Sequence, residues 1–187
     1  MFFRNWNKDL FTIPNLLSLF RLTLIPVYMT IYLEGRCLLA GAILALSCLT
    51  DLLDGWVARR FHMVTELGKL LDPLADKATQ LSLTVCLSLR HPILQPVLLL
   101  LISKEAFQLA AGILFLRQGK ILSRGLLMGK ICTAVLFLSL TALVLLPGLS
   151  PAAVNLLALI DLAVLSLSFL GYVQAYFGSG RYLRNLE

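Results

Sequence analysis

The sequence from Thr50 to Lys77, TDLLDGWVARRFHMVTELGKLLDPLADK, places four aspartates in an otherwise strongly apolar chain. Asp51 and Asp54 are three residues apart, and Asp72 and Asp76 are four apart. Because residues three or four apart share a face of a helix, each pair is predicted to project from one side of its helix. The short polar stretch between the pairs predicts two helices joined as an antiparallel hairpin.

Helix rise predicts that the two pairs lie at matching depths. At ~1.5 Å per residue, Asp51 and Asp76 lie about 12 Å from the turn, and Asp54 and Asp72 lie about 6–8 Å from it. Like charges this close in a region of low dielectric constant repel one another unless cations neutralise them. An all-oxygen cluster suits hard cations such as Mg²⁺, Mn²⁺ or Ca²⁺. We therefore predict that Asp51, Asp54, Asp72 and Asp76 bind one or two divalent ions.

The rest of the 187-residue chain has the composition of a membrane protein, with a hydrophobic fraction of 59% and recurring long apolar runs. It is predicted to be a single all-α integral membrane domain. Its six transmembrane helices are expected at about 14–33, 37–59, 68–89, 93–116, 127–146 and 152–176. Residues 1–11 mix aromatic and charged side chains, which predicts a short interfacial helix, with a frayed terminus as the alternative. No secretory signal peptide is expected at this end.

Basic residues gather in the loops on one predicted side of the membrane. That side receives the N-terminus, the loops at 59–68 and 117–126, and the tail from Phe177, whereas the opposite loops carry only Arg36 and Arg90. By the positive-inside rule, both termini and the aspartate site face the cytoplasm. The net charge of +6 then reflects topology and anionic lipid head groups, so we expect no nucleic-acid partner.

A second set of charges is predicted to lie inside the spans. Arg21, Lys104 and Lys130 are candidates for an anion site, because a bound phosphate would offset the cost of burying them. Glu105 is expected to pair with Lys104 or with another nearby cation. Asp161, near the middle of the last span, is interpreted as a structural hydrogen-bonding residue and is given no functional role.

The hairpin pattern resembles the signature of the CDP-alcohol phosphatidyltransferase family. All eight fixed positions of that signature are matched by Asp51-x-x-Asp54-Gly55-x-x-Ala58-Arg59 and Gly68-x-x-x-Asp72-x-x-x-Asp76. The start of the chain, from Ile13 through Arg21 to Pro26, is similar to the phosphatidylglycerophosphate synthase and cardiolipin synthase branches. The six-span plan of the family covers essentially the whole chain.

This resemblance implies transfer of a phosphatidyl group from CDP-diacylglycerol to an alcohol, with release of CMP. Mg²⁺ or Mn²⁺ on the four aspartates would bind the pyrophosphate of the donor. Asp76 is the implied general base, which takes the proton of the acceptor hydroxyl. The implied contacts of the CDP group are Asp54, Gly55, Ala58, Arg59, Gly68 and Asp72. The small residues in this set let a nucleotide approach the backbone, although close helix packing in lipid requires the same residues.

Two acceptor alcohols remain open. In phosphatidylglycerophosphate synthases an arginine is expected where Gly112 stands and a lysine where Cys132 stands, so two cations are absent. The cations that could still hold glycerol 3-phosphate are Arg21, Lys104, Arg117, Arg124, Lys130 and Arg181. We place glycerol 3-phosphate ahead of phosphatidylglycerol, which is the acceptor of the cardiolipin synthase branch.

The resemblance also implies a homodimer. The stretch from Val64 to Lys69 resembles bacterial phosphatidylglycerophosphate synthases, which implies a bacterial inner membrane. The alternative from another class of protein is a divalent-cation transporter that uses the aspartates as its site. Against a transporter, the acidic groups lie in one hairpin near one surface, and no repeated half is visible in the sequence.

Overall fold

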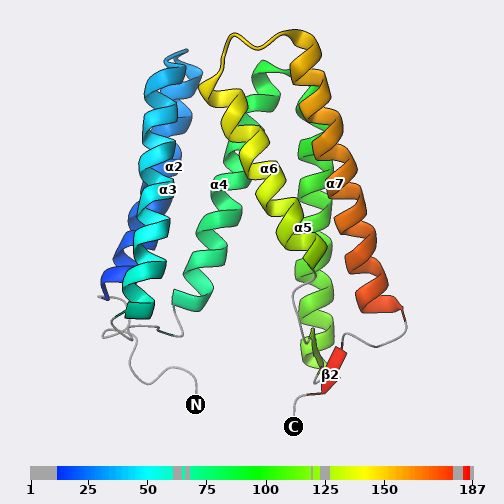
Figure 1. Cartoon of the computed structure of the whole chain (residues 1–187). Coiled ribbons are helices and arrows are strands. Elements are labelled where there is room, and N and C mark those ends of the chain that lie inside the picture. Colours follow the sequence, from blue (N-terminus) through cyan, green and yellow to red (C-terminus); the bar gives the residue numbers. More distant parts are fainter. Residues whose placement is uncertain are drawn as a thin grey trace. The chain divides into compact units, whose positions relative to one another are not determined.

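The computed structural model describes residues 12–60, 65, 68–118, 120–122, 127–178 and 183–185. Within these residues the chain is helical apart from one small sheet (Figure 1). The chain divides into two compact units, residues 1–86 and 87–187, and the boundary falls inside one helix. The expected interfacial helix at 1–11 lies outside the described residues.

The first unit consists of α2 (Ile13–Leu33), α3 (Cys37–Arg60) and most of α4 (Gly68–Arg90), which lie side by side in Figure 1. α2 and α3 form a closely packed antiparallel pair. Side chains of α2 bond to α4 in rising order along both helices, so α2 and α4 run parallel. α3 is therefore antiparallel to α4, as the hairpin prediction requires. The side chains of α2 bond to both of these helices.

The turn between α2 and α3 requires a glycine. Gly35 has a φ of 85°, the left-handed region that residues with a Cβ rarely adopt. Its amide bonds to the carbonyl of Tyr32 at 3.0 Å, and the amide of Arg36 bonds to the carbonyl of Ile31 at 3.2 Å. These two bonds form a Schellman motif, which satisfies the last carbonyls of α2 and reverses the chain.

The second unit consists of the end of α4, the 3₁₀ turn η1 (Pro92–Leu94), α5 (Gln95–Arg117), β1 (Lys120–Leu122), α6 (Leu127–Leu145), α7 (Pro151–Phe177) and β2 (Leu183–Asn185). α7 packs against both α5 and α6. The side chain of Ser150 caps the start of α7 by accepting a hydrogen bond from the amide of Ala153 at 3.3 Å. Pro151 follows the cap at a position where a missing amide costs nothing.

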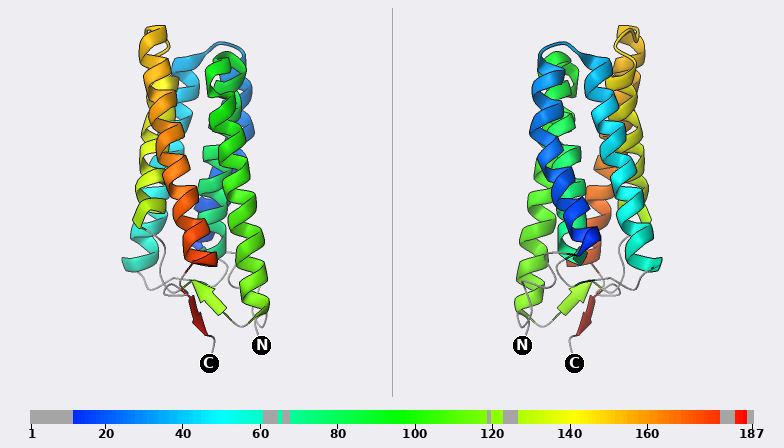
Figure 2. Two further views of the ribbon diagram at one scale, coloured as in Figure 1. Left: turned by 90° about the vertical axis from the view of Figure 1, so that its right-hand side faces the viewer. Right: turned by 90° about the vertical axis from the view of Figure 1, so that its left-hand side faces the viewer.

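The strands β1 and β2 form an antiparallel sheet in which Ile121 is opposite Arg184 (Figure 2). The all-α prediction holds for the six long helices, and this short sheet is an addition that the sequence analysis did not predict. Strands of three residues are too short to show the period-two pattern, and the two partners lie far apart in the sequence. Because β1 follows α5 and β2 follows α7, the carboxyl ends of these two helices lie on the same side of the second unit.

The described helices end within two residues of the predicted span boundaries. Among the described residues, four stretches are long and apolar enough to cross a membrane: Asn15–Leu33, Pro92–Arg117, Met128–Leu145 and Pro151–Phe177. Within the described side chains, α3 contributes a shorter apolar stretch, Cys37–Asp51. Many leucines on these helices are exposed, as expected of side chains that face lipid.

Candidate active site

Three polar side chains form a buried face on α2. Asn15, Ser18 and Arg21 are spaced by three residues, and their exposed fractions are 1%, 0% and 3%. Residues at this spacing lie along one side of a helix. Buried polar groups are costly unless they find partners, and all three find them on α3 or α4, or on Thr65 just before α4.

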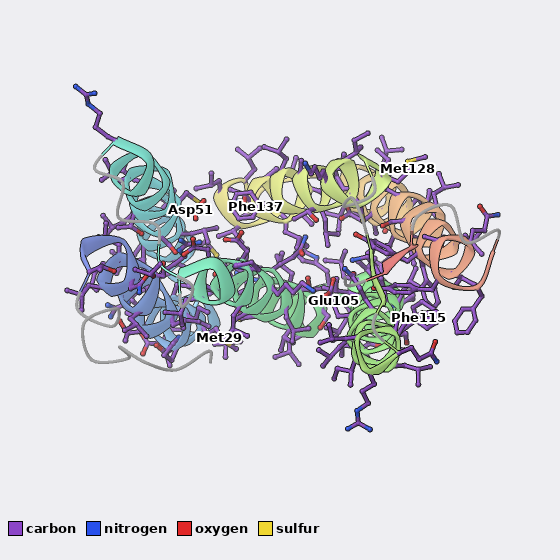
Figure 3. The ribbon with its side chains drawn as sticks, turned by 90° about the horizontal axis from the view of Figure 1, so that it is seen from below. Met29, Asp51, Glu105, Phe115, Met128 and Phe137 are labelled. Atoms are coloured by element: carbon purple, nitrogen blue, oxygen red, sulfur yellow. The ribbon has the colours of Figure 1, made fainter. Side chains whose placement is uncertain are left out.

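Arg21 bridges aspartates on two different helices. Its Nη2 lies 2.6 Å from Asp51 Oδ1 on α3, and its Nη1 lies 2.6 Å from Asp76 Oδ1 on α4. Figure 3 shows Asp51 on α3 where that helix approaches α2. Since one planar guanidinium reaches both carboxylates, Asp51 and Asp76 lie at the same level of the helices, as helix rise predicted. Sequence analysis placed Arg21 with the phosphate-binding cations, whereas the structure places it on the aspartates.

The third described aspartate is also attached to α2. The hydroxyl of Ser18 donates a hydrogen bond of 2.6 Å to Asp72 Oδ1. Hydrogen bonds to an ionised carboxylate are shorter and stronger than those between neutral groups. Ser18 lies one turn from Arg21, so a single face of α2 contacts Asp51, Asp72 and Asp76.

Asn15 holds the start of α4. Its amide nitrogen donates to Thr65 Oγ1 at 3.0 Å, and Thr65 Oγ1 donates to Asn15 Oδ1 at 3.2 Å. Thr65 Oγ1 also accepts a hydrogen bond of 3.0 Å from the amide of Gly68, the first residue of α4. These bonds fix the position of α4 along α2, and with it the level of the aspartates that α4 carries.

Position 68 has no room for a side chain, because Asn15 fills the space beside its backbone. A Cβ on Gly68 would lie 2.6 Å from Asn15 Oδ1 and 3.1 Å from Thr65 Oγ1. Of the two interpretations of this glycine, close packing between helices therefore has direct support. Its contact with a nucleotide stays a prediction. The side chains of Asp54, Gly55, Ala58 and Arg59, the other predicted CDP contacts on α3, lie outside the described residues.

The donor set fits a hard cation by its chemistry. Asp51, Asp72 and Asp76 supply only carboxylate oxygens, and two of them already share a cationic group in Arg21. Among the side chains that the structure describes, no three acidic, histidine or cysteine groups converge closely enough to form a metal site. Asp54, the fourth predicted ligand, falls outside that search.

The cations predicted on α5 and α6 lie in the second unit. Lys104 is buried, its Nζ lies 2.7 Å from Glu105 Oε1, and it sits 5.7 Å from the centre of the Tyr172 ring. Glu105 is labelled on α5 in Figure 3, and its predicted pairing with Lys104 is confirmed. Arg117 and Lys130 are exposed on their helices. Arg124 and Arg181 lie outside the described residues.

Asp161 has the structural hydrogen bond that sequence analysis expected. It is fully buried in α7, and its Oδ2 accepts a hydrogen bond of 2.7 Å from the hydroxyl of Ser139 in α6. This bond joins the two helices across their interface.

Buried polar side chains bonded to aspartates, on helices of membrane-spanning length, are typical of a membrane protein with a site for charged groups. A sequence model of the family described as CDP-alcohol phosphatidyltransferase matches residues 11–169. The chain belongs to this family. Four helices of spanning length, together with membership of a membrane enzyme family, make it an integral membrane protein.

Curated relatives fall into two groups by name. The chain is 36% identical over 129 residues to a CDP-diacylglycerol–glycerol-3-phosphate 3-phosphatidyltransferase of Aquifex aeolicus, covering 68% of this chain and 72% of the relative. It is 42% identical over 101 residues to a cardiolipin synthase (CMP-forming) of Rattus norvegicus, covering 54% of this chain and 33% of the relative. It is 33% identical over 108 residues to a cardiolipin synthase (CMP-forming)/mitochondrial hydrolase fusion protein of Schizosaccharomyces pombe, covering 58% and 18%. In these last two, the chain matches a third of the relative or less.

Proposed function

We propose that the protein transfers a phosphatidyl group from CDP-diacylglycerol to glycerol 3-phosphate, which gives phosphatidylglycerophosphate and CMP. The observation that carries this proposal is the attachment of Asp51, Asp72 and Asp76 to one buried face of α2. These are three of the four aspartates of the family signature, and they come from two helices to bond to the same helix, α2. The name of the Aquifex relative supports the same reaction.

The reaction needs positive charge where the donor pyrophosphate binds. Asp51, Asp54, Asp72 and Asp76 would hold Mg²⁺ or Mn²⁺, as one ion or two. When bound, a divalent ion supplies charge that stabilises the departing phosphate of CMP. The side chains of α2 contribute by holding the carboxylates in place before any substrate arrives.

The chemical step is a substitution at phosphorus. The hydroxyl oxygen of the acceptor attacks the phosphorus that bears the diacylglycerol, and Asp76 takes the proton of that hydroxyl. The bond from this phosphorus to the bridging oxygen breaks, and CMP leaves with the electron pair. Asp54, Gly55, Ala58, Arg59, Gly68 and Asp72 are the proposed contacts of the CDP group.

A second acceptor, phosphatidylglycerol, has specific support. Lys104 is the buried cation expected to hold a phosphorylated acceptor, and its charge is already compensated by Glu105 at 2.7 Å. A lysine whose charge is balanced by a carboxylate attracts a phosphate less strongly than an unpaired lysine would. With the cardiolipin synthase relatives, this pairing makes phosphatidylglycerol the alternative acceptor. Family membership, by contrast, leaves the transporter alternative without support of its own.

We also propose that all six helices cross the membrane, with both termini and the aspartates on the cytoplasmic side. The parallel arrangement of α2 and α4 agrees with this topology, as does the sheet that places the carboxyl ends of α5 and α7 together. α3 and α4 cross despite their aspartates because those side chains turn to α2 instead of lipid. The bacterial inner membrane, the interfacial helix at 1–11 and the homodimer stay predictions.

An acceptor screen tests the proposal. The purified protein in detergent would receive CDP-diacylglycerol, Mn²⁺ and either glycerol 3-phosphate or phosphatidylglycerol, and both CMP and the lipid product would be measured. We expect CMP and phosphatidylglycerophosphate with the first acceptor, and no CMP after addition of excess EDTA. Cardiolipin from the second acceptor alone would establish the alternative. No CMP with either acceptor, together with cation flux in liposomes, would contradict both and restore the transporter.

A further inference from the structure

The bonds between α2 and the aspartates run from buried side chains to side chains that are partly exposed. Arg21 bonds to Asp51 and Asp76, and Ser18 bonds to Asp72. Arg21 is only 3% exposed, whereas the side chains of Asp51 and Asp76 are 43% and 53% exposed. The α2 side chains therefore contact the carboxylates from the buried side, while the side chains of Asp51 and Asp76 stay about half exposed.

This arrangement has the form of an outer shell around a metal site. Carboxylates that bind metals are usually hydrogen-bonded by a second layer of residues, which fixes their orientation and contributes to affinity. We propose that Ser18 and Arg21 are positioning residues that orient the three aspartates toward a divalent cation on their exposed side. This inference rests on the proposed function only through the assignment of the aspartates as metal ligands.

The choice of residue at each position agrees with this role. A guanidinium is planar, with two terminal nitrogens at a fixed separation, so it holds two carboxylates at a defined distance from each other. A lysine has the same charge but a single ammonium on a flexible stem, and it cannot impose that spacing. Ser18 orients Asp72 through one hydroxyl, which suits the single carboxylate that it contacts. Asn15 supports both by fixing the start of α4.

Binding of Mn²⁺ in the absence of lipid substrates tests the proposal, since the free ion is counted directly by electron paramagnetic resonance. The informative variants are Ser18→Ala, which removes the bond to Asp72, and Arg21→Lys, which keeps the charge but loses the two-point geometry. The matched controls are Thr23→Ala, an exposed residue on the same helix, and Arg36→Lys, an exposed arginine in the turn after α2.

We expect Mn²⁺ to bind about 10- to 100-fold more weakly to Ser18→Ala and Arg21→Lys than to the unaltered protein, with both controls within about twofold of it. Gel filtration and thermal unfolding of the same samples give the folded fraction, and the affinity is expressed per folded molecule. If Ser18 or Arg21 had a structural role alone, the Mn²⁺ affinity per folded molecule would not change. Unchanged Mn²⁺ affinity in folded Ser18→Ala would overturn the proposal, and this variant is informative even where Arg21→Lys does not fold.

The outcomes separate this inference from the proposed function. Tight Mn²⁺ binding that weakens in Ser18→Ala, without CMP release from any acceptor, would support the positioning role and reject the enzymatic one. Normal turnover, together with the same Mn²⁺ affinity in every variant, would support the enzymatic function and reject the positioning role.

Discussion

The hydroxyl of Tyr172 on α7 occupies the space in which a side chain at Gly129 of α6 would have to lie. A Cβ on Gly129 would overlap the phenol oxygen, and it would lie 3.1 Å and 3.2 Å from two ring carbons. The centre of the Tyr172 ring also lies 5.7 Å from Lys104 Nζ, beside the Lys104–Glu105 pair. The glycine therefore allows α6 to approach α7 next to the proposed acceptor cation.

Substitution of this glycine tests the close approach. Gly129→Ala is expected to destabilise the protein by about 1–3 kcal/mol, because an added methyl in a filled space displaces its neighbours. Thermal unfolding in detergent measures the change. Gly112→Ala is the matched control, since its Cβ would meet the hydroxyl of Tyr176 at an ordinary 3.7 Å. Equal effects of the two substitutions would contradict the explanation.

Gly68→Ala is expected to disturb the contact between α2 and the start of α4. The new methyl would force the Asn15 amide away from Thr65. Each hydrogen bond lost costs about 0.5–1.5 kcal/mol, so the stability should fall. We also expect lower CMP release, because α4 and the aspartates on it would shift relative to α2.

A double-mutant cycle isolates the contact that Gly68 makes. If the methyl acts through Asn15, adding Gly68→Ala to Asn15→Ala should cost little further activity. Gly148→Ala is the control, because no atom lies within 4 Å of the Cβ it would add. Additive losses in the double variant would show that Gly68 acts in another way, such as by contact with the nucleotide.

Asp76→Asn is expected to lower turnover by about 10²- to 10⁴-fold, since an amide cannot take the proton of the acceptor. The protein should remain folded, because Arg21 still forms its ion pair with Asp51. CMP release measures turnover, and gel filtration reports the fold. Glu34→Gln, an exposed acid in the turn after α2, should have no effect. Near-normal turnover in Asp76→Asn would remove this residue from the role of base.

Lys130→Ala is expected to raise the KM for glycerol 3-phosphate by up to about tenfold, as the loss of one charge-assisted hydrogen bond would. Lys130 is exposed, so the substitution should leave the stability unchanged. The KM for CDP-diacylglycerol should stay the same, and Arg36→Ala should alter neither constant. A parallel rise in both KM values would show that Lys130 binds the donor.

The helices could be predicted because apolar runs bounded by glycine, proline and charged residues leave few choices for their ends. The level of Asp51 and Asp76 followed from helix rise alone, and Arg21 confirms it. What the sequence did not reveal was that Arg21 stands between these aspartates. A cation in an apolar span indicates a buried anion, but it does not distinguish a substrate phosphate from a carboxylate of the same chain.

Asn15 and Ser18 were missed as members of the site, although a signal for them existed. Polar residues at three-residue intervals, ending at Arg21, mark one face of an otherwise apolar helix. That spacing predicts a polar partner opposite, and the aspartates on the next two helices were the available candidates. The two-stranded sheet left no comparable signal, since pairing between distant three-residue segments depends on the tertiary structure that brings them together.

The sheet also has a consequence for how the protein is made. β1 emerges from the ribosome before α6 and α7, and its partner β2 comes only after both. The strand that follows α5 therefore stays unpaired throughout insertion of the last two helices. Pairing of β1 with β2 can occur only after α6 and α7 have been synthesised, so the sheet forms after both helices of this hairpin exist.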